Sequence, residues 1–184
     1  KTISPSMDIL VASNLERLLY YLSDGDCDYI ASLMNDLNEK GFYTVKPEIL
    51  ARIQETFHAG FATDAETRAT IKSTYEKDQV LIDTHTAVAK CVLDRISKDG
   101  TERVCLSTAS PYKFCSDVLQ ALGEPTEGMN DFACMDALEA ATHTVAPVQL
   151  SSLRFSEKLH TGVCDIEGMG AVVEDASLKI FARS

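Results

Sequence analysis

Apolar residues recur at helical spacing along most of this sequence. In one such set, Leu15, Leu18, Leu19 and Leu22 fall at positions i, i+3, i+4 and i+7 and therefore share one face of a helix. A second helix is expected from Asp26 to Lys40, with an inward face of Ile30, Leu33, Met34 and Leu37. A helix with an apolar stripe must bury it against another element, so the pattern predicts a helix-rich globular fold.

Local start and stop signals mark the ends of these helices. Ser13 and Glu16 have the spacing of a capping box, and Gly41 suits the left-handed position after a helix. Further helices are predicted from Pro47, with Ile49, Ile53 and Phe57 inward, then after Asp64 with Glu66 in its first turn, and from Asp131 to Thr142. The first part of the chain, residues 1–78, is therefore expected to be mainly helical.

Short apolar segments precede helical patterns in the rest of the chain. Residues 80–82 lead through a polar loop into a helix with Val88, Cys91, Val92 and Ile96 inward, which is expected to end at Gly100. Residues 103–106 and 160–164 also read as strands, and the helix after the last one carries a stripe of Ile166, Met169, Val173, Ala176 and Ile180. This alternation predicts an α/β fold in which residues 79–184 form strand–helix units, a helix-rich three-layer arrangement with a few mostly parallel strands.

Charge and composition exclude several classes of protein. The 17 Lys and Arg against 28 Asp and Glu give a net charge of −11, so a nucleic-acid partner is not expected. No apolar run is long enough for a transmembrane helix. The six cysteines form no C-x-x-C pair, and His85 with Cys91 or His160 with Cys164 lacks a second ligand pair. We therefore expect buried, reduced thiols, no metal site and a cytoplasmic location.

Two polar loops are candidates for a ligand site, because ligands of α/β sheets bind beyond the carboxyl ends of the strands. One loop carries the hydroxyls of Ser107, Thr108 and Ser110, and the other is the run Asp83, Thr84, His85 and Thr86. The alternative is that Asp83 and Ser110 are ordinary N-caps. Lys90 and Lys113 follow these loops and are interpreted as exposed helical residues rather than Schiff-base lysines.

Four segments, taken in order, resemble threonine synthase. They are residues 4–9 (SPSMDI), 13–19 (SNLERLL), 83–89 (DTHTAVA) and 107–114 (STASPYKF). The resemblance implies the tryptophan-synthase-β-like fold known as fold type II and a lyase that uses pyridoxal 5'-phosphate. In this family, the cofactor serves to convert O-phospho-L-homoserine and water into L-threonine and phosphate.

The resemblance also implies roles for single residues. Thr108, or its neighbour Ser107, is expected to face the pyridine nitrogen of the cofactor, and His85 and Thr86 to line the pocket. Ser13, Asn14 and Arg17 match a string at the head of a helix, where Arg17 would suit a substrate phosphate or form an ion pair with a carboxylate. Ala89 stands where many relatives have glycine.

Parts of the family pattern do not occur in this sequence. The lysine that holds the cofactor and the Gly/Asn-rich loop that binds its phosphate both precede the matched region in the family, and the chain begins at Lys1 with its first methionine at Met7. We therefore expect a C-terminal fragment with no catalytic residue of its own and weak or absent cofactor binding. Its expected partners are the missing N-terminal half of the enzyme and, in a homo-oligomer, further copies.

Two alternatives remain open at this point. One is a non-catalytic binding or regulatory domain that keeps the same fold. The other is a threonine-synthase-like phospho-lyase, which would use the same cofactor on a different phosphorylated amino acid.

Overall fold

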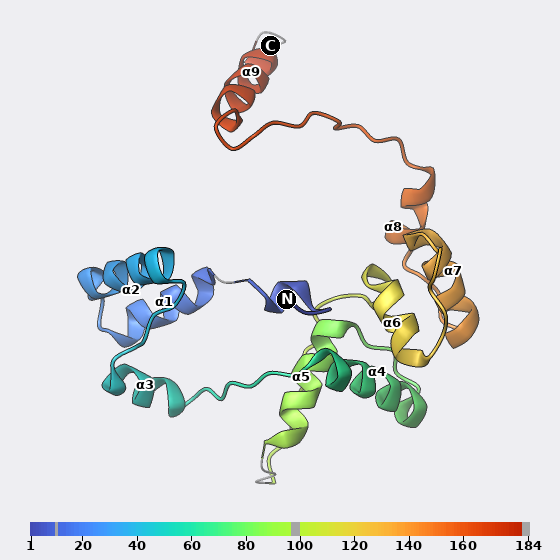
Figure 1. Cartoon of the computed structure of the whole chain (residues 1–184), viewed down its shortest axis with the longest axis horizontal. Helices are drawn as coiled ribbons and strands as arrows, with labels where there is room; N and C mark the ends of the chain where they lie inside the picture. Colours follow the sequence, from blue (N-terminus) through green and yellow to red (C-terminus); the bar gives the residue numbers. More distant parts are fainter. Residues whose placement is uncertain (10, 97–99, 182–184) are drawn as a thin grey trace. The chain divides into compact units, whose positions relative to one another are not determined.

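The computed structural model describes residues 1–9, 11–96 and 100–181 (Figure 1). The chain forms two compact units, Lys1–Ser151 and Ser152–Ser184. The first unit contains η1 (Pro5–Met7), α1 (Ser13–Leu22), α2 (Cys27–Lys40), α3 (Pro47–Gln54), α4 (Asp64–Asp78), α5 (Thr84–Arg95), η2 (Pro111–Lys113), α6 (Cys115–Leu122), α7 (Asp131–Thr142) and α8 (Val148–Ser151). The second contains η3 (Ser152–Phe155) and α9 (Met169–Phe181). In the described residues no helix is long and apolar enough to cross a membrane.

Side-chain caps define the starts of several helices. The Asp26 carboxylate accepts the Tyr29 N–H at the start of α2, and Gly41 ends that helix with a φ of +78°. The capping box predicted at Ser13 is wrong, because α1 begins at Ser13 itself and Ala12, which has no capping side chain, precedes it. A capping box occurs instead before α4, where Thr63 and Glu66 satisfy each other's backbone N–H groups.

The apolar stripes of α1, α2 and α3 meet in one buried cluster. Leu19 is fully buried there, together with Ile30, Leu33 and Ile49, and Leu22 and Met34 pack against them. Four expected members are not part of it. Leu15 is 42% exposed, and Phe57, beyond the end of α3, is 50% exposed, whereas Leu18 is half-buried and Leu37 is buried outside this cluster. The helical periodicity therefore identified the buried face correctly but extended it too far at both ends.

A second buried cluster joins α4, α5, α6 and α7. Its fully buried side chains include Ile71, Val118, Leu119 and Leu138. Polar contacts fix the same helices at their edges: Arg68 Nη2 lies 3.1 Å from Asp117 Oδ1, and the Tyr75 hydroxyl donates to the carbonyl of Thr142. This cluster supports the start of α5, at which the candidate ligand-binding residues gather.

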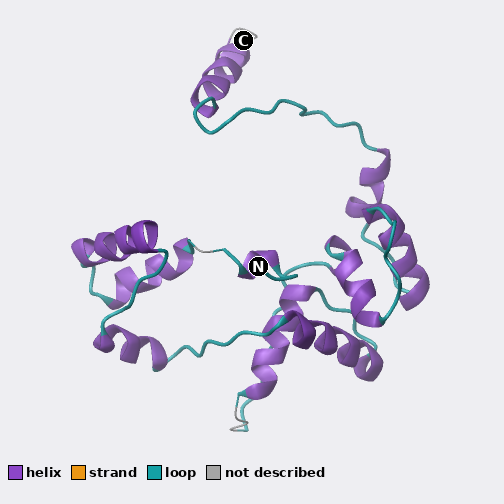
Figure 2. Ribbon diagram, viewed as in Figure 1, coloured by secondary structure: helices purple, strands orange, loops and turns teal. Residues whose placement is uncertain are grey.

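The predicted parallel strands are not observed in the part of the chain that the structure describes (Figure 2). Side chains 103–106 still alternate, with Arg103 and Cys105 half-buried and Val104 and Leu106 exposed at 77% and 72%. The segment thus keeps the period of a strand but has no pairing strand among the described residues. A strand is stable only when its backbone groups pair with those of another strand. Residues 80–82 and 160–164 likewise lie outside regular structure. The expectation of a helix-rich chain is therefore confirmed, whereas the expected sheet is not observed among the described residues. The expected division of the chain into residues 1–78 and 79–184 stays a prediction.

Two helix ends also differ from expectation. α5 stops at Arg95, and Ile96 has an extended conformation with ψ of 136°, so Ile96 is not an inward helical residue. The rest of the expected helix, residues 97–99, lies outside the described residues. α9 begins at Met169 rather than at Ile166, and in its unit Val173 and Ile180 are exposed.

Replacement of Leu119 should test the second cluster. We expect Leu119→Ala to lower the free energy of unfolding by about 2–5 kcal/mol, because the lost side chain leaves a cavity in a fully buried site. The control is Leu159→Ala, at a position 79% exposed, which should change it by less than about 0.5 kcal/mol. Urea unfolding followed by circular dichroism measures both, and equal effects would contradict the assigned core.

Candidate functional site

The carboxylate of Asp83 organises the start of α5. Asp83 is fully buried, and its Oδ1 accepts the backbone N–H of His85 at 2.8 Å. Its Oδ2 accepts the N–H of Thr86 at 3.4 Å and the hydroxyl of the same residue. A carboxylate in this position satisfies helix N–H groups that have no other acceptor and lies at the positive end of the helix dipole. Asp83 is therefore an N-cap, the alternative that the sequence offered to a direct role in ligand binding.

The imidazole of His85 joins this cap to the amino-terminal segment. His85 Nδ1 lies 2.9 Å from Asp83 Oδ1, and Nε2 accepts the backbone N–H of Ser6 at 3.1 Å. Next to it, the buried Ser4 hydroxyl donates to the carbonyl of Thr84 at 3.2 Å. The segment around η1 is thus attached to the first turn of α5 by two hydrogen bonds that it donates, one from the Ser6 N–H to His85 and one from the Ser4 hydroxyl to Thr84.

The two predicted polar loops meet at a common cavity of about 280 Å³. His85 and Thr108 both line it, together with Met7 and Cys105. Behind this lining, Thr86 Oγ1 lies 3.4 Å from Ser107 Oγ, which links the two loops directly. The structure therefore brings His85, Thr86, Ser107 and Thr108 together, although 21 residues separate Thr86 from Ser107.

Ser13, Asn14 and Arg17 form a separate group at the start of α1. Ser13 and Arg17 line a second cavity of about 300 Å³ with Tyr20 and Ile30, and no residue lines both this cavity and that of Thr108. The Arg17 guanidinium donates to Asn14 Oδ1. Of the two predicted roles for Arg17, the ion pair with a carboxylate is not formed among the described residues, and the phosphate role stays a prediction.

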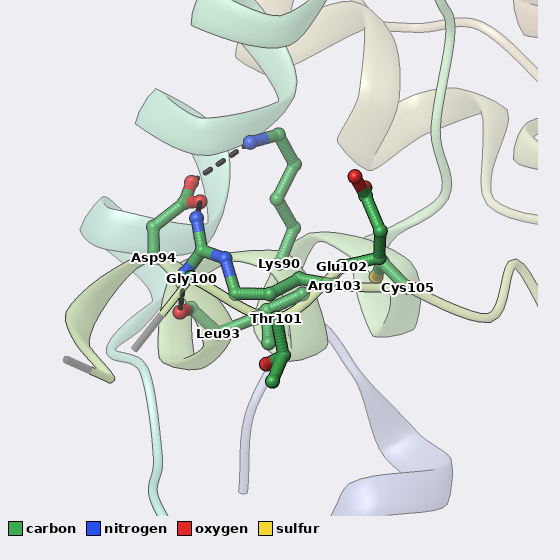
Figure 3. A pocket seen from close by; sticks show the side chains of 8 residues that line it. All are labelled: Lys90, Leu93, Asp94, Gly100, Thr101, Glu102, Arg103 and Cys105. Atoms are coloured by element: carbon green, nitrogen blue, oxygen red, sulfur yellow. Dashed lines mark hydrogen bonds and ion pairs between the residues drawn. The ribbon is translucent and has the colours of Figure 1, made fainter. Parts of the chain in front are cut away.

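A larger cavity, of about 460 Å³, lies at the other end of α5 and contains none of the predicted site residues. Lys90 Nζ and Arg103 Nη2 approach the two oxygens of Asp94 at 2.8 and 3.8 Å, and Arg103 Nη1 donates to the carbonyl of Leu93 (Figure 3). Lys90 is therefore ion-paired in a helical i, i+4 contact, but its side chain is half-buried and not exposed as predicted.

Two cysteines are poorly ionised thiols: Cys105, which lines two of the cavities, and Cys115, which is buried in the second apolar cluster. The expected burial is wrong for Cys27 and Cys164, which are exposed. Burial raises the pKa of Cys105, with Asp94 and Asp83 adding to the rise and Lys90 opposing it. Burial also raises the pKa of Cys115 to about 11. Within the described residues, no cluster of three or more His, Cys, Asp or Glu side chains has the geometry of a metal site.

Local sequence signals could not reveal the role of the amino-terminal segment. The bond from Ser6 to His85 spans 79 residues, and that from Ser4 to Thr84 spans 80. The run Ser4-Pro5 does predict a tight turn, because Pro5 suits the first position of η1. It carries no signal about where that turn will be attached.

Several known proteins are similar to this chain in sequence and in fold. The family model described as "Threonine synthase, C-terminal" matches residues 86–158. Threonine synthase-like 1 of Pongo abelii is 36% identical over 122 residues, 66% of this chain and 16% of that protein. A PLP-bound threonine synthase from Brucella melitensis superposes with a TM-score of 0.67 at 33% identity, over 86% of this chain and 30% of the other. For threonine synthase from yeast the TM-score is 0.71 at 28% identity, over 97% of this chain and 37% of the yeast chain.

These similarities relate the chain to pyridoxal phosphate enzymes of fold type II. Within that class, the resemblance to threonine synthase is confirmed: the chain is a relative of the C-terminal part of that enzyme. It spans between 16% and 37% of the length of the relatives described above.

Removal of the buried cap should destabilise the chain strongly. We expect Asp83→Ala to cost roughly 2–4 kcal/mol of unfolding free energy, since the backbone N–H groups of α5 and the His85 ring lose their acceptor in a buried site. Asp26→Ala removes an exposed cap of the same type and should cost only about 0.5–2 kcal/mol. Thermal and urea unfolding compare the two variants, and a smaller effect at Asp83 would be inconsistent with its assigned role.

Thiol labelling should follow the two pKa shifts. Because the thiolate is the reactive form, a raised pKa lowers reactivity at pH 8, and the exposed Cys27 and Cys164 should react with iodoacetamide well before Cys105 and Cys115. The rate at Cys115 should keep rising as the pH approaches about 11. Peptide mass spectrometry measures the order, and labelling in denaturant is the control, in which this order should disappear.

Proposed function

We propose that this chain forms one wall of the active site of a threonine synthase, which converts O-phospho-L-homoserine and water into L-threonine and phosphate. The observation that carries the proposal is the cavity shared by His85 and Thr108. Thr108 lies within residues 86–158, which match the threonine synthase model, and His85 directly precedes them. Support for the cofactor comes from the similarity to a threonine synthase described as PLP-bound.

The residues at this cavity fit one edge of pyridoxal 5'-phosphate. The Thr108 hydroxyl is a neutral partner for a pyridine nitrogen and would not hold that nitrogen protonated as a carboxylate would. Small-molecule sites usually enclose about 300–1,000 Å³. At about 280 Å³, this cavity would hold only part of the cofactor and its substrate. The sequence has no Gly-rich phosphate cradle, so other protein must bind the cofactor phosphate.

Each predicted site residue then has a limited task. The cofactor, when bound, supplies an electron sink for proton removal from the substrate. Thr108 would orient its ring, with Ser107 as the neighbouring hydroxyl, while His85 and Thr86 would shape the pocket wall. Arg17, with Ser13 and Asn14 at the first turn of α1, would bind the substrate phosphate, because a guanidinium and free helix N–H groups both suit that anion.

The proposal requires a second polypeptide segment, the N-terminal half of the enzyme. It would provide the covalent lysine and the phosphate loop that are missing from these 184 residues. Residues 103–106 offer a place for it, since Val104 and Leu106 are exposed and strand-like segments recruit a pairing strand. On this view the separate chain is inactive.

Titration of this chain with pyridoxal 5'-phosphate tests the proposal. We expect weak binding and no stoichiometric lysine adduct after borohydride reduction, measured by mass spectrometry. Stoichiometric modification of Lys90 or Lys113 at low cofactor concentration would contradict the proposed division of the active site.

In a full-length enzyme that contains this chain, Thr108→Val should lower kcat/KM for phosphohomoserine by about tenfold, the effect of losing one hydrogen bond of roughly 1.4 kcal/mol. The matched control is Thr101→Val, on the wall of the other cavity, which should leave kcat/KM within about twofold because Thr101 does not line the Thr108 cavity. Equal losses in the two variants would exclude a cofactor contact at Thr108.

A second candidate function is a threonine-synthase-like phospho-lyase that acts on another phosphorylated hydroxy amino acid. The relative named threonine synthase-like 1 is 36% identical to this chain, and its name specifies no substrate. Turnover of phosphohomoserine, phosphothreonine and phosphoserine by the full-length protein separates the two enzymes. Lack of turnover with all three would support the remaining alternative, a non-catalytic binding or regulatory domain of the same fold.

A further inference from the structure

We infer that His85 is a positioning residue, which clamps the segment Ser4 to Met7 onto the wall of the Thr108 cavity, and that it is not a proton-transfer group. The importance of that cavity rests on the proposed function, but the clamp is defined by contacts of this chain alone. Both ring nitrogens are engaged, Nδ1 with Asp83 and Nε2 with Ser6.

The contacts fix which nitrogen carries the proton. The Ser6 backbone N–H is a donor only, so Nε2 must offer it a lone pair. The ring proton therefore lies on Nδ1 and is donated to the Asp83 carboxylate at 2.9 Å. This carboxylate is held in turn by the backbone and side chain of Thr86, so the ring orientation is determined before any ligand binds.

The same contacts leave no free base at His85. A general base needs a lone pair directed at the substrate, and the lone pair on Nε2 is already used. The other near neighbours are Thr84 Oγ1, 3.4 Å from Nδ1, and the Phe114 ring, with centroids 4.7 Å apart. With its side chain only 5% exposed, the ring contributes a wall to the cavity and an anchor for its neighbour.

The anchor affects the cavity through Met7. Met7 is the last residue of η1 and lines the cavity with His85 and Thr108. One further bond attaches the segment itself, from Ser4 Oγ to the Thr84 carbonyl, and another holds the residue before it, from the Ile3 N–H to Asp64 Oδ1. Of these bonds, the one from Ser6 is accepted by His85, which itself lines the cavity. Its loss should make the neighbouring Met7 more mobile, while the other bonds still hold the segment.

Two substitutions at His85 separate the functions of its nitrogens. In His85→Asn the amide replaces Nδ1 as donor to Asp83 but cannot reach Ser6, whereas in His85→Gln the longer side chain can offer an oxygen near the position of Nε2. We expect His85→Asn to speed hydrogen exchange of the Ser6 amide by about 3–10-fold, the effect of losing one hydrogen bond, and His85→Gln to restore slow exchange. Ser6→Ala keeps the N–H and is the matched control, with unchanged exchange.

The unmodified chain provides a test that does not depend on the folding of any variant. Its ¹⁵N spectrum should show a proton on Nδ1 of His85 and a free lone pair on Nε2. A proton on Nε2, or equally fast Ser6 exchange in the Asn and Gln variants, would overturn the inference. These measurements need neither cofactor nor substrate, so a full-length protein without turnover would refute the proposed function and leave the role of His85 to be decided separately.

Discussion

The candidate site depends on the hydrogen bonds that the buried carboxylate of Asp83 accepts. Removing a carboxylate from water costs several kcal/mol unless donors surround it, and here the donors come from the first turn of α5 and from the ring of His85. The arrangement combines helix initiation with the orientation of a side chain that reaches the amino-terminal segment. One charge thus determines both where α5 begins and what is attached to its first turn.

Two kinds of packing hold the first unit together. The helices α1 to α7 bury apolar side chains in two clusters, which need only approximate shape and the correct period. The loops near the cavity are held differently, by hydrogen bonds between hydroxyls, a histidine and backbone groups that are far apart in sequence. The apolar clusters therefore supply stability, whereas the polar contacts supply the geometry of the site.

The sequence predicted the features that depend on local chemistry. The inward faces of α1 and α2, the left-handed Gly41 and the N-cap at Asp83 all follow from spacing and side-chain type. The strands could not be settled in the same way, because residues 103–106 have strand periodicity but no neighbour among the described residues. The hydrogen bond from Ser6 to His85 could not be predicted either, because neither segment carries a sequence signal that identifies the other. Thr108 was selected through a family resemblance, and the structure adds only that it shares a cavity with His85.

The alternation along residues 103–106 restricts how this edge can be completed. Arg103 already donates to the Leu93 carbonyl, and the Cys105 thiol faces the carbonyl of Thr86, so both inward positions are fixed by α5. A strand that pairs here must accept Val104 and Leu106 on the outward face, because a shift of one residue would exchange the two faces. The contacts of Arg103 and Cys105 with α5 therefore restrict the register of this segment to one in which Val104 and Leu106 stay on the outward face.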